Sequence, residues 1–251
     1  MIGSTIVRLD SVDSTNNYAA RELLTKSLNE GTVFVADCQQ SGRGTGQASW
    51  ESAIGLNLTF SIILYPKQVA IARQFYISKA ISLGVADFLA KSVGRVSIKW
   101  PNDIYVDERK IAGILIETAI SSGKFSRVIV GIGLNVNQVA FVSDAPNPVS
   151  LKNLTGKTYE LSQMLGDLCI YLDNRYISLI RGEYSILDQD YDQRLYLKGV
   201  WANFREQDPV LREEGTVFEG KILRIEGDGR LQIETRSGEV RGFYFKEVAF
   251  L

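Results

Sequence analysis

The residues best suited to chemistry lie between positions 99 and 117, in the stretch KWPNDIYVDERKIAGILIE. Lys99, Asp103 and Lys110 stand there among apolar residues that alternate with polar ones, a pattern typical of β-strands. The triplet DER interrupts the alternation and predicts a tight turn between two strands. Lys110 opens the second strand just before its apolar run, which indicates an ammonium group held against a site. From this fragment alone, a surface lysine whose aliphatic chain covers apolar neighbours is the simpler interpretation.

A second candidate is the glycine-rich segment GRGTG at positions 42–46, which follows an apolar strand. Its glycines allow the backbone to approach a ligand closely and to direct N–H groups at phosphate oxygens. Arg43 could bind a carboxylate or a phosphate through two parallel hydrogen bonds. The segment lacks the full glycine spacing and the following helix of a dinucleotide-binding fingerprint. An ordinary surface loop is therefore the alternative.

Two further segments combine glycine with polar residues. GIGLNVN at 131–137 ends an apolar strand, where glycines indicate either a bulge or the close approach of a ligand. Its asparagines offer donors and acceptors that would match the edge of adenine, although asparagine also simply ends strands in turns. LTGKT at 154–158 is similar to part of a phosphate-binding P-loop, but that motif needs a glycine where this chain has Leu151. We predict a turn there.

Composition restricts the chemistry further. The 251 residues are 45% hydrophobic and 23% charged, with a net charge of −1, as in a soluble globular protein that does not attract nucleic acid. The absence of histidine excludes Ser-His-Asp and Cys-His catalysis and argues against zinc. Charge stabilisation by lysine and arginine, as in phosphoryl or nucleotidyl transfer, suits these side chains. Cys38 and Cys169 are far apart, and the chain shows no signal peptide or membrane span, so we expect a cytoplasmic protein.

The elements that must position these residues follow from periodicity. Strands are predicted at 4–12, 32–38, 56–65 and 125–137 and within 99–117, and helices at 13–28, 69–89, 161–180 and 185–196. Asp13 or Ser14 is expected to cap the first helix. Adjacent strands joined by short turns, with helices between them, favour an α+β fold with a mixed β-sheet. From residue 217 onward, short strands and glycine turns predict a small appended β-barrel.

The order of four segments carries a family resemblance: DSTN at 13–16, QQSGRGTG with a tryptophan at 50, KWPND followed by RKIAGIL, and GIGLNVN. Together they closely resemble the biotin–protein ligases, or biotin–[acetyl-CoA-carboxylase] ligases. The resemblance covers roughly residues 13–137. It implies a class II synthetase-like mixed sheet packed with helices in a catalytic domain at 1–198, and an SH3-like β-barrel at 199–251. Since only about a dozen residues precede DSTN, we expect the form without an N-terminal DNA-binding domain.

The resemblance also implies a role for individual residues. The catalytic ones would be Lys110, Arg43 and Asp103, and the Asp103 carboxylate would hold Mg²⁺. The residues implied to bind biotin are Ser14, Thr15, Asn16, Gln39, Gly42, Arg43, Lys110 and Gly113. Those implied to bind the nucleotide are Arg43, Thr45, Trp50, Lys99, Asn102, Lys110 and Asn135.

Such an enzyme would join biotin to ATP as biotinyl-5′-AMP and then transfer biotin to a lysine of a biotin carboxyl carrier protein domain. We expect a monomer or weak homodimer with no DNA and no membrane partner. Two alternatives remain: a lipoate or octanoate ligase or transferase of the same superfamily, and a biotin-binding regulator without catalysis. The regulator is favoured by one departure, since many family members carry further arginines, as GRGRxGR, where this chain has Thr45, Gln47 and Ala48.

Overall fold

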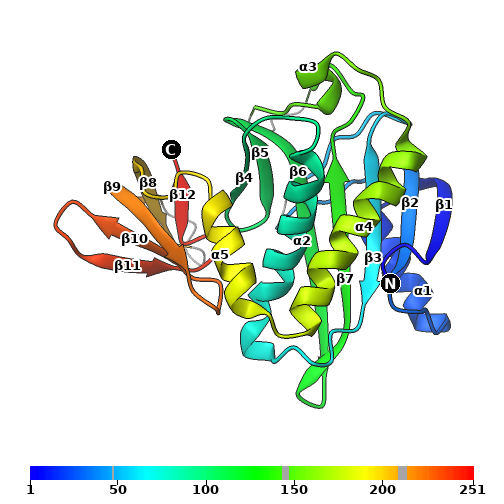
Figure 1. Ribbon diagram of the computed structural model, residues 1–251, viewed down its shortest axis with the longest axis horizontal. Coiled ribbons are helices and arrows are strands. Elements are labelled where there is room, and N and C mark those ends of the chain that lie inside the picture. The colour runs from blue at the N-terminus through cyan, green and yellow to red at the C-terminus, as the bar shows by residue number, and fades with distance from the viewer. Residues whose placement is uncertain (47, 143–146, 209–213) are drawn as a thin grey trace.

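A computed structural model describes residues 1–46, 48–142, 147–208 and 214–251, so that Gln47 of the glycine-rich loop lies outside the described residues. The larger part is built on a seven-stranded sheet in the order β1-β2-β3-β7-β6-β5-β4 (Figure 1). Its strands are β1 (Thr5–Val12), β2 (Thr32–Gln39), β3 (Leu58–Leu64), β4 (Val96–Lys99), β5 (Asp103–Val106), β6 (Arg109–Ser121) and β7 (Lys124–Leu134). β1 and β2 run parallel and the other neighbours are antiparallel, which confirms the predicted mixed sheet.

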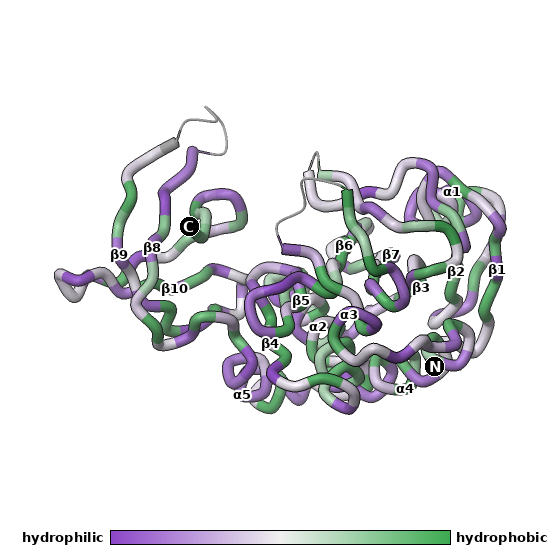
Figure 2. Tube along the Cα trace, turned by 90° about the horizontal axis from the view of Figure 1, so that it is seen from above, coloured by the Kyte–Doolittle hydropathy of each residue, from purple (hydrophilic) through white to green (hydrophobic). Residues whose placement is uncertain are grey.

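Alternation along the strands gives this sheet two different faces. In β3, Phe60 and Ile62 point into the main core, whereas Ile63 belongs to a smaller apolar cluster on the opposite face. The helices are α2 (Phe75–Leu89), α4 (Leu161–Ile180) and α5 (Tyr184–Arg194) on the side of the main core, and α1 (Thr15–Thr25) on the other side (Figure 2). Small residues on the α1 side, such as Ser61 and its register partner Gly131, let the N-terminus of α1 lie directly on the sheet, where a Cβ at Gly131 would come within 2.4 Å of Asn16 Oδ1.

Two predicted elements differ from the structure in detail. The helix predicted at 69–89 is a 3-10 turn, Ile71–Arg73, followed by α2. The LTGKT segment is not a turn throughout, because α3 (Leu151–Thr155) precedes the bend at Gly156, whose φ is 72°. Ser150 caps α3 through its Oγ, which accepts a hydrogen bond from the backbone N–H of Asn153. A helix this short has too few residues for its periodicity to be recognised in the sequence.

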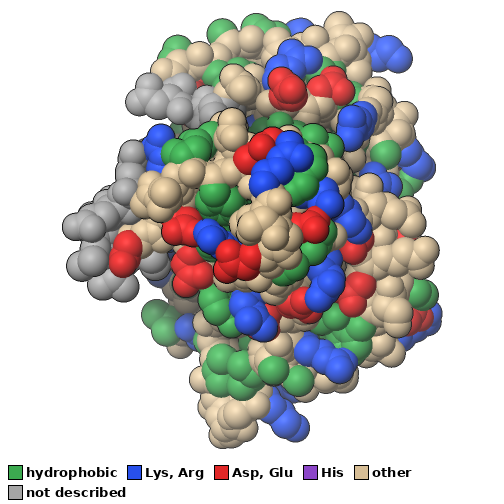
Figure 3. Space-filling view, turned by 90° about the vertical axis from the view of Figure 1, so that its left-hand side faces the viewer, with side chains coloured by type: hydrophobic (Ala, Val, Ile, Leu, Met, Phe, Trp, Pro, Cys, Tyr) green, Lys and Arg blue, Asp and Glu red, His purple; other side chains and the backbone are tan. Residues whose placement is uncertain are grey.

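The C-terminal segment forms a second, five-stranded antiparallel sheet in the order β11-β10-β9-β8-β12, with the predicted SH3-like fold. Its strands are β8 (Trp201–Gln207), β9 (Glu214–Ile225), β10 (Leu231–Thr235), β11 (Val240–Phe243) and β12 (Val248–Phe250). The Phe218 ring stacks against the rings of Phe204 and Phe243. Side chains of both charges intermingle on the face of the molecule at this end (Figure 3), as in the ion pair of Arg236 with Glu219.

Buried polar contacts hold the barrel against the larger domain. Lys79 of α2 is fully buried, and its Nζ donates to Asp188 Oδ1 at 2.6 Å and to the Ile225 carbonyl at 3.3 Å. Trp100 Nε1, beyond the end of β4, donates to the Gly229 carbonyl at 2.9 Å. These contacts fix one side of the barrel beside the hairpin that contains the KWPND motif. The domain boundary between residues 198 and 199 stays a prediction.

The two cysteines form no disulfide, and Cys169 packs in the main core. Cys38 and Cys169 are both free, as expected from their separation, and burial raises the pKa of Cys169 to about 11. No helix in the described ranges is both long and apolar enough to cross a membrane.

Candidate active site

A cavity of about 350 Å³ lies where the main sheet, the N-terminus of α1, the glycine-rich loop and the barrel meet. Most of the predicted site residues line it, namely Ser14, Thr15, Asn16, Gln39, Arg43, Thr45, Trp50, Asn102, Asp103, Lys110 and Gly113. Gly42, Lys99 and Asn135 do not line it. The barrel contributes Gln207 and Lys246 among others, which no motif had predicted.

Within the segment KWPNDIYVDERKIAGILIE, strands β5 and β6 form a β-hairpin that brings Lys110 to Asp103. Lys110 Nζ lies 2.8 Å from Asp103 Oδ1, and the two side chains are 21% and 25% exposed. A bulge between Ile104 and Tyr105 shifts the register of β5 against β6. The Lys110 backbone is held on its outer side as well, because its N–H donates to the Asn147 carbonyl at 2.9 Å. The lysine is therefore presented from a rigid strand with its charge facing the cavity.

Trp50 lies on a surface made by glycines of two neighbouring strands. Gly113 of β6 pairs with Gly133 of β7, and a Cβ added at Gly133 would lie 2.3 Å from Trp50 Cε2. The pairing of β7 with β3 and β6 is regular at Gly131 and Gly133, so these glycines mark close approach and not a bulge. Trp50 Nε1 is buried and has no hydrogen-bond partner in the described part of the chain. It is thus a donor left for a ligand.

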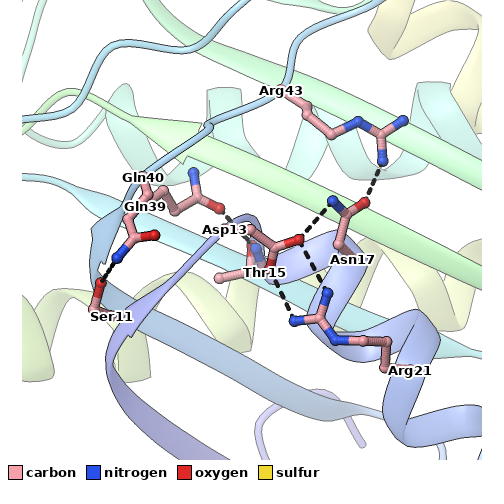
Figure 4. A network of polar contacts seen from close by, with 8 residues as sticks. All are labelled: Ser11, Asp13, Thr15, Asn17, Arg21, Gln39, Gln40 and Arg43. Atoms are coloured by element: carbon pink, nitrogen blue, oxygen red, sulfur yellow. Dashed lines mark hydrogen bonds and ion pairs between the residues drawn. The ribbon is translucent and has the colours of Figure 1, made fainter.

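Arg43 is held at the cavity by residues of the DSTN segment and the following turn of α1 (Figure 4). Its guanidinium donates to Asn17 Oδ1 at 2.6 Å and to Glu117 Oε1 at 3.0 Å. Asn17 in turn donates to Asp13, which also accepts two hydrogen bonds from Arg21. The Arg21 guanidinium holds the pKa of Asp13 well below its ordinary value. The result is a fixed network whose inner end is the Arg43 cation.

The N-terminus of α1 presents a polar pocket wall. Ser14 is the N-cap by position, but its side chain makes no capping hydrogen bond, contrary to expectation. Gln39 Oε1 accepts from the Thr15 N–H at 2.8 Å and from Thr15 Oγ1 at 3.1 Å. Asn16 Nδ2 donates to Glu117 Oε2 at 2.8 Å, inside the sheet wall. Hydroxyls and amides gathered in one wall suit a ligand with several carbonyl and amide groups.

Glu117 and Lys246 are charged residues at this site that carried no predicted role. Glu117 of β6 accepts hydrogen bonds from both Arg43 and Asn16, so it orients two residues with predicted roles. A charged residue inside an apolar strand was its signal in the sequence. Lys246 comes from the far end of the chain, and nothing in its local sequence pointed to the cavity.

The predicted residues outside the cavity have other surroundings. Lys99 Nζ lies 5.0–5.8 Å from the ring centroids of Tyr105, Tyr196 and Phe250, and burial lowers the pKa of Lys99. Asn135 Nδ2 donates to the Val149 carbonyl, while its buried Oδ1 has no partner within the described ranges.

Gly42 stands at the base of the glycine-rich loop, where a Cβ would lie 2.4 Å from the Trp50 carbonyl. Only glycine fits there without moving the backbone that carries Trp50. Gly42 therefore shapes the loop instead of facing the cavity.

The side chains around Asp103 are those that a Mg²⁺ ion bound to a nucleotide would meet. Among the described residues, no three His, Cys, Asp or Glu side chains gather in a way that could hold a metal by themselves. Mg²⁺ on a nucleotide typically needs only one or two carboxylates, because phosphate oxygens and water complete its shell. Asp103, at the cavity edge, fits that requirement.

Comparisons with known proteins identify the family to which this sequence is similar. The model of the biotin/lipoate A/B protein ligase family matches residues 9–135. The bifunctional ligase/repressor BirA of Bacillus spizizenii is 28% identical over 244 residues, covering 95% of this chain and 72% of that protein. The biotin–[acetyl-CoA-carboxylase] ligase of Paracoccus denitrificans is 32% identical over 164 residues, or 62% of this chain and 67% of that protein.

A solved structure matches the whole fold. The biotin protein ligase from Aquifex aeolicus, in complex with biotin and ATP, superimposes with a TM-score of 0.80 at 24% identity and covers 99% of both chains. With the family model matching half of the sequence, the chain is a ligase that belongs to the biotin/lipoate A/B protein ligase family.

Proposed function

We propose that this chain is a biotin–protein ligase that activates biotin with ATP and passes it to a lysine of a biotin carboxyl carrier protein domain. One observation carries the proposal: Lys110 and Asp103 form an ion pair in the same cavity as Thr15, Gln39, Arg43 and the other residues that the family resemblance implies. The names of the relatives from Bacillus and Paracoccus, and the ligands of the Aquifex structure, support biotin and ATP as the substrates.

In the first half-reaction, a biotin carboxylate oxygen attacks the α-phosphorus of ATP. The new C–O–P linkage is biotinyl-5′-AMP, and the bond from the α-phosphorus to the bridging oxygen breaks to release pyrophosphate. Negative charge increases around the α-phosphorus during this step, and the Lys110 ammonium would stabilise it from a fixed strand. Arg43, which is oriented by Asn17 and Glu117, would neutralise a second part of that charge.

Asp103 and the nucleotide phosphates would hold Mg²⁺, which supplies charge neutralisation on the phosphates when bound. Lys110, when it contacts the nucleotide, has to share or leave its ion pair with Asp103. The polar wall of Ser14, Thr15 and Gln39 would receive the ureido ring of biotin. A fatty or lipoyl chain has no group to use such donors and acceptors, which is why we favour biotin over lipoate.

In the second half-reaction, the ε-amine of the acceptor lysine attacks the acyl carbon of the mixed anhydride. The acyl C–O bond breaks, AMP leaves, and the amine loses a proton as the amide forms. Asp103 would be close enough to the reacting groups to receive that proton if Lys110 moves toward phosphate. The Trp50 indole and the glycine-rich loop would keep water from the anhydride, since they cover the glycine-lined part of the sheet.

The test is biotin-dependent exchange of pyrophosphate into ATP by the purified chain, with lipoate assayed in parallel. We expect exchange with biotin, and its loss in Lys110→Met but not in Lys124→Met, a lysine in the distant β6–β7 hairpin. Exchange with lipoate alone would overturn the substrate, and exchange with neither would overturn the enzymatic proposal. Transfer is then tested with a biotin carboxyl carrier domain and its Lys→Arg variant, by a shift in mass.

A further inference from the structure

Lys246 lies in the turn between β11 and β12 with a backbone conformation that normally belongs to glycine. Its φ is 71°, and non-glycine residues in that region concentrate at functional sites. Its side chain leaves the barrel and lines the cavity. A Cβ added at Gly46, at the tip of the glycine-rich loop, would lie 2.9 Å from Lys246 Nζ. The ammonium of a barrel residue thus reaches the loop of the other domain.

This ammonium differs from the other cations of the cavity in having no acidic partner among the residues that the structure describes. Arg43 is paired with Glu117 and Lys110 with Asp103. Lys246 Nζ lies 5.7 Å from the centroid of the Phe245 ring. Within the described ranges, no ion pair joins Lys246 to a carboxylate. A cation that faces a cavity without a counter-charge is prepared to receive an anion.

The neighbouring loop has no cation beyond Arg43. Between Arg43 and Trp50 the sequence contains no lysine or arginine. Instead, Thr45 Oγ1 accepts a hydrogen bond from Asn102 Nδ2 at 2.8 Å, which ties the loop tip to the residue next to Asp103. The contacts therefore run from Lys246 through the loop tip to the Asp103 side of the cavity.

We propose that Lys246 binds the β- and γ-phosphates of the nucleotide and takes over the charge that loop arginines would supply. The inference rests on the proposed function, because it needs a nucleotide triphosphate in this cavity. Lys110 and Arg43 would hold the α-phosphate end, where the bond breaks, and Lys246 the pyrophosphate that leaves. The barrel is then part of the nucleotide site, through one side chain carried on a tight turn.

The test is direct binding of an ATP analogue with a methylene group between the α- and β-phosphorus atoms, and of inorganic pyrophosphate. Calorimetry on the full chain compares wild type, Lys246→Gly and Lys246→Arg, with and without biotin. Lys246→Gly removes the charge at a position whose backbone suits glycine, so the fold is retained. Ser122→Gly, at the β6–β7 turn with φ 51°, is a matched control for relief of strain, and Lys124→Ala for loss of surface charge.

We expect Kd for the analogue and for pyrophosphate to rise roughly tenfold in Lys246→Gly, as on loss of one charge-assisted hydrogen bond, and to recover in Lys246→Arg. Biotin affinity and both controls should match wild type. Unchanged affinity for both anions in Lys246→Gly overturns the inference and leaves the proposed function standing, even if carrier transfer is slower. A wild-type chain that binds the anions through Lys246 but catalyses no biotin-dependent exchange overturns the function and keeps the anion site. A wild-type chain that binds neither anion, with or without biotin, overturns both.

Discussion

Replacing Gly133 by alanine tests whether the Trp50 indole has to lie flat on the sheet. The backbone of Gly133 is not in the left-handed region, so alanine is tolerated there by the main chain. Its Cβ would lie 2.3 Å from Trp50 Cε2, whereas ordinary contact begins at 3.4 Å. The indole must therefore retreat by the difference, at least 1.1 Å. β7 is paired on both sides and cannot move instead.

The consequence should be larger for catalysis than for stability. A displacement of about 1 Å in a positioning group can lower a rate about 10²-fold. The centroid of the Trp50 ring lies 5.7 Å from Lys110 Nζ, so a shift of the indole also changes the surroundings of that ammonium. We expect biotin-dependent pyrophosphate exchange to fall roughly 10- to 100-fold in Gly133→Ala. Because Trp50 belongs to a loop that can yield, the free energy of unfolding should fall by only about 1 kcal/mol, at the low end of overpacking.

The assay is exchange at saturating biotin and ATP, with urea unfolding of the same samples. Gly166→Ala in α4 is the control, since nothing lies within 4 Å of the added Cβ and activity should be unchanged. In a Trp50→Ala background the Gly133→Ala change should have little further effect, because the overlap is gone. Wild-type exchange in Gly133→Ala, or an equal loss in both backgrounds, would refute the argument that the glycine surface exists for Trp50.

Three other changes follow from the contacts. Lys110→Met should lower pyrophosphate exchange by about 10²- to 10³-fold at nearly unchanged stability, since a fixed donor to the developing charge is lost. Lys79→Met should lower the free energy of unfolding by about 1–3 kcal/mol in urea titrations, because it removes the cation paired with Asp188, a carboxylate that is 43% exposed and keeps its hydrogen bond from the Tyr76 hydroxyl. The third change, Asp13→Asn, concerns how stability depends on pH in acid. The folded pKa of Asp13 is depressed by Arg21, so its stabilisation is present above the ordinary pKa of about 3.9 and is lost as pH falls through the folded value. Below about pH 4, the free energy of unfolding should therefore decrease less steeply with falling pH in Asp13→Asn than in wild type.

Each of these has an outcome that contradicts it. Exchange in Lys110→Met within a few-fold of wild type would remove the lysine from the chemistry. A Lys79→Met protein as stable as wild type would mean that the buried cation contributes nothing to the joint between helix and barrel. Parallel pH profiles for wild type and Asp13→Asn would show that the Asp13–Arg21 pair is as weak as other exposed ion pairs.

Much of this protein was determined by local sequence. Apolar runs predicted β2, β3 and β7 closely, and helical spacing predicted α4, because each buried element carries a hydrophobic signal in its own sequence. The hairpin of β5 and β6 was evident for the same reason, with its turn at the charged triplet. The glycines of GIGLNVN and GRGTG indicated that another group lies close to the backbone, but the sequence did not identify that group as Trp50.

Tertiary structure alone decided which groups meet. Arg43 depends on Glu117, which lies 74 positions away in sequence, and Trp50 rests on two glycines of strands that pair far from it. Lys246 reaches the same cavity from the far end of the chain, because buried contacts such as that of Lys79 with Ile225 dock the barrel there. Local periodicity reports only which face of an element is buried. The partner across a cavity is set by how strands order in the sheet and how the domains dock, and no short window of sequence contains that information.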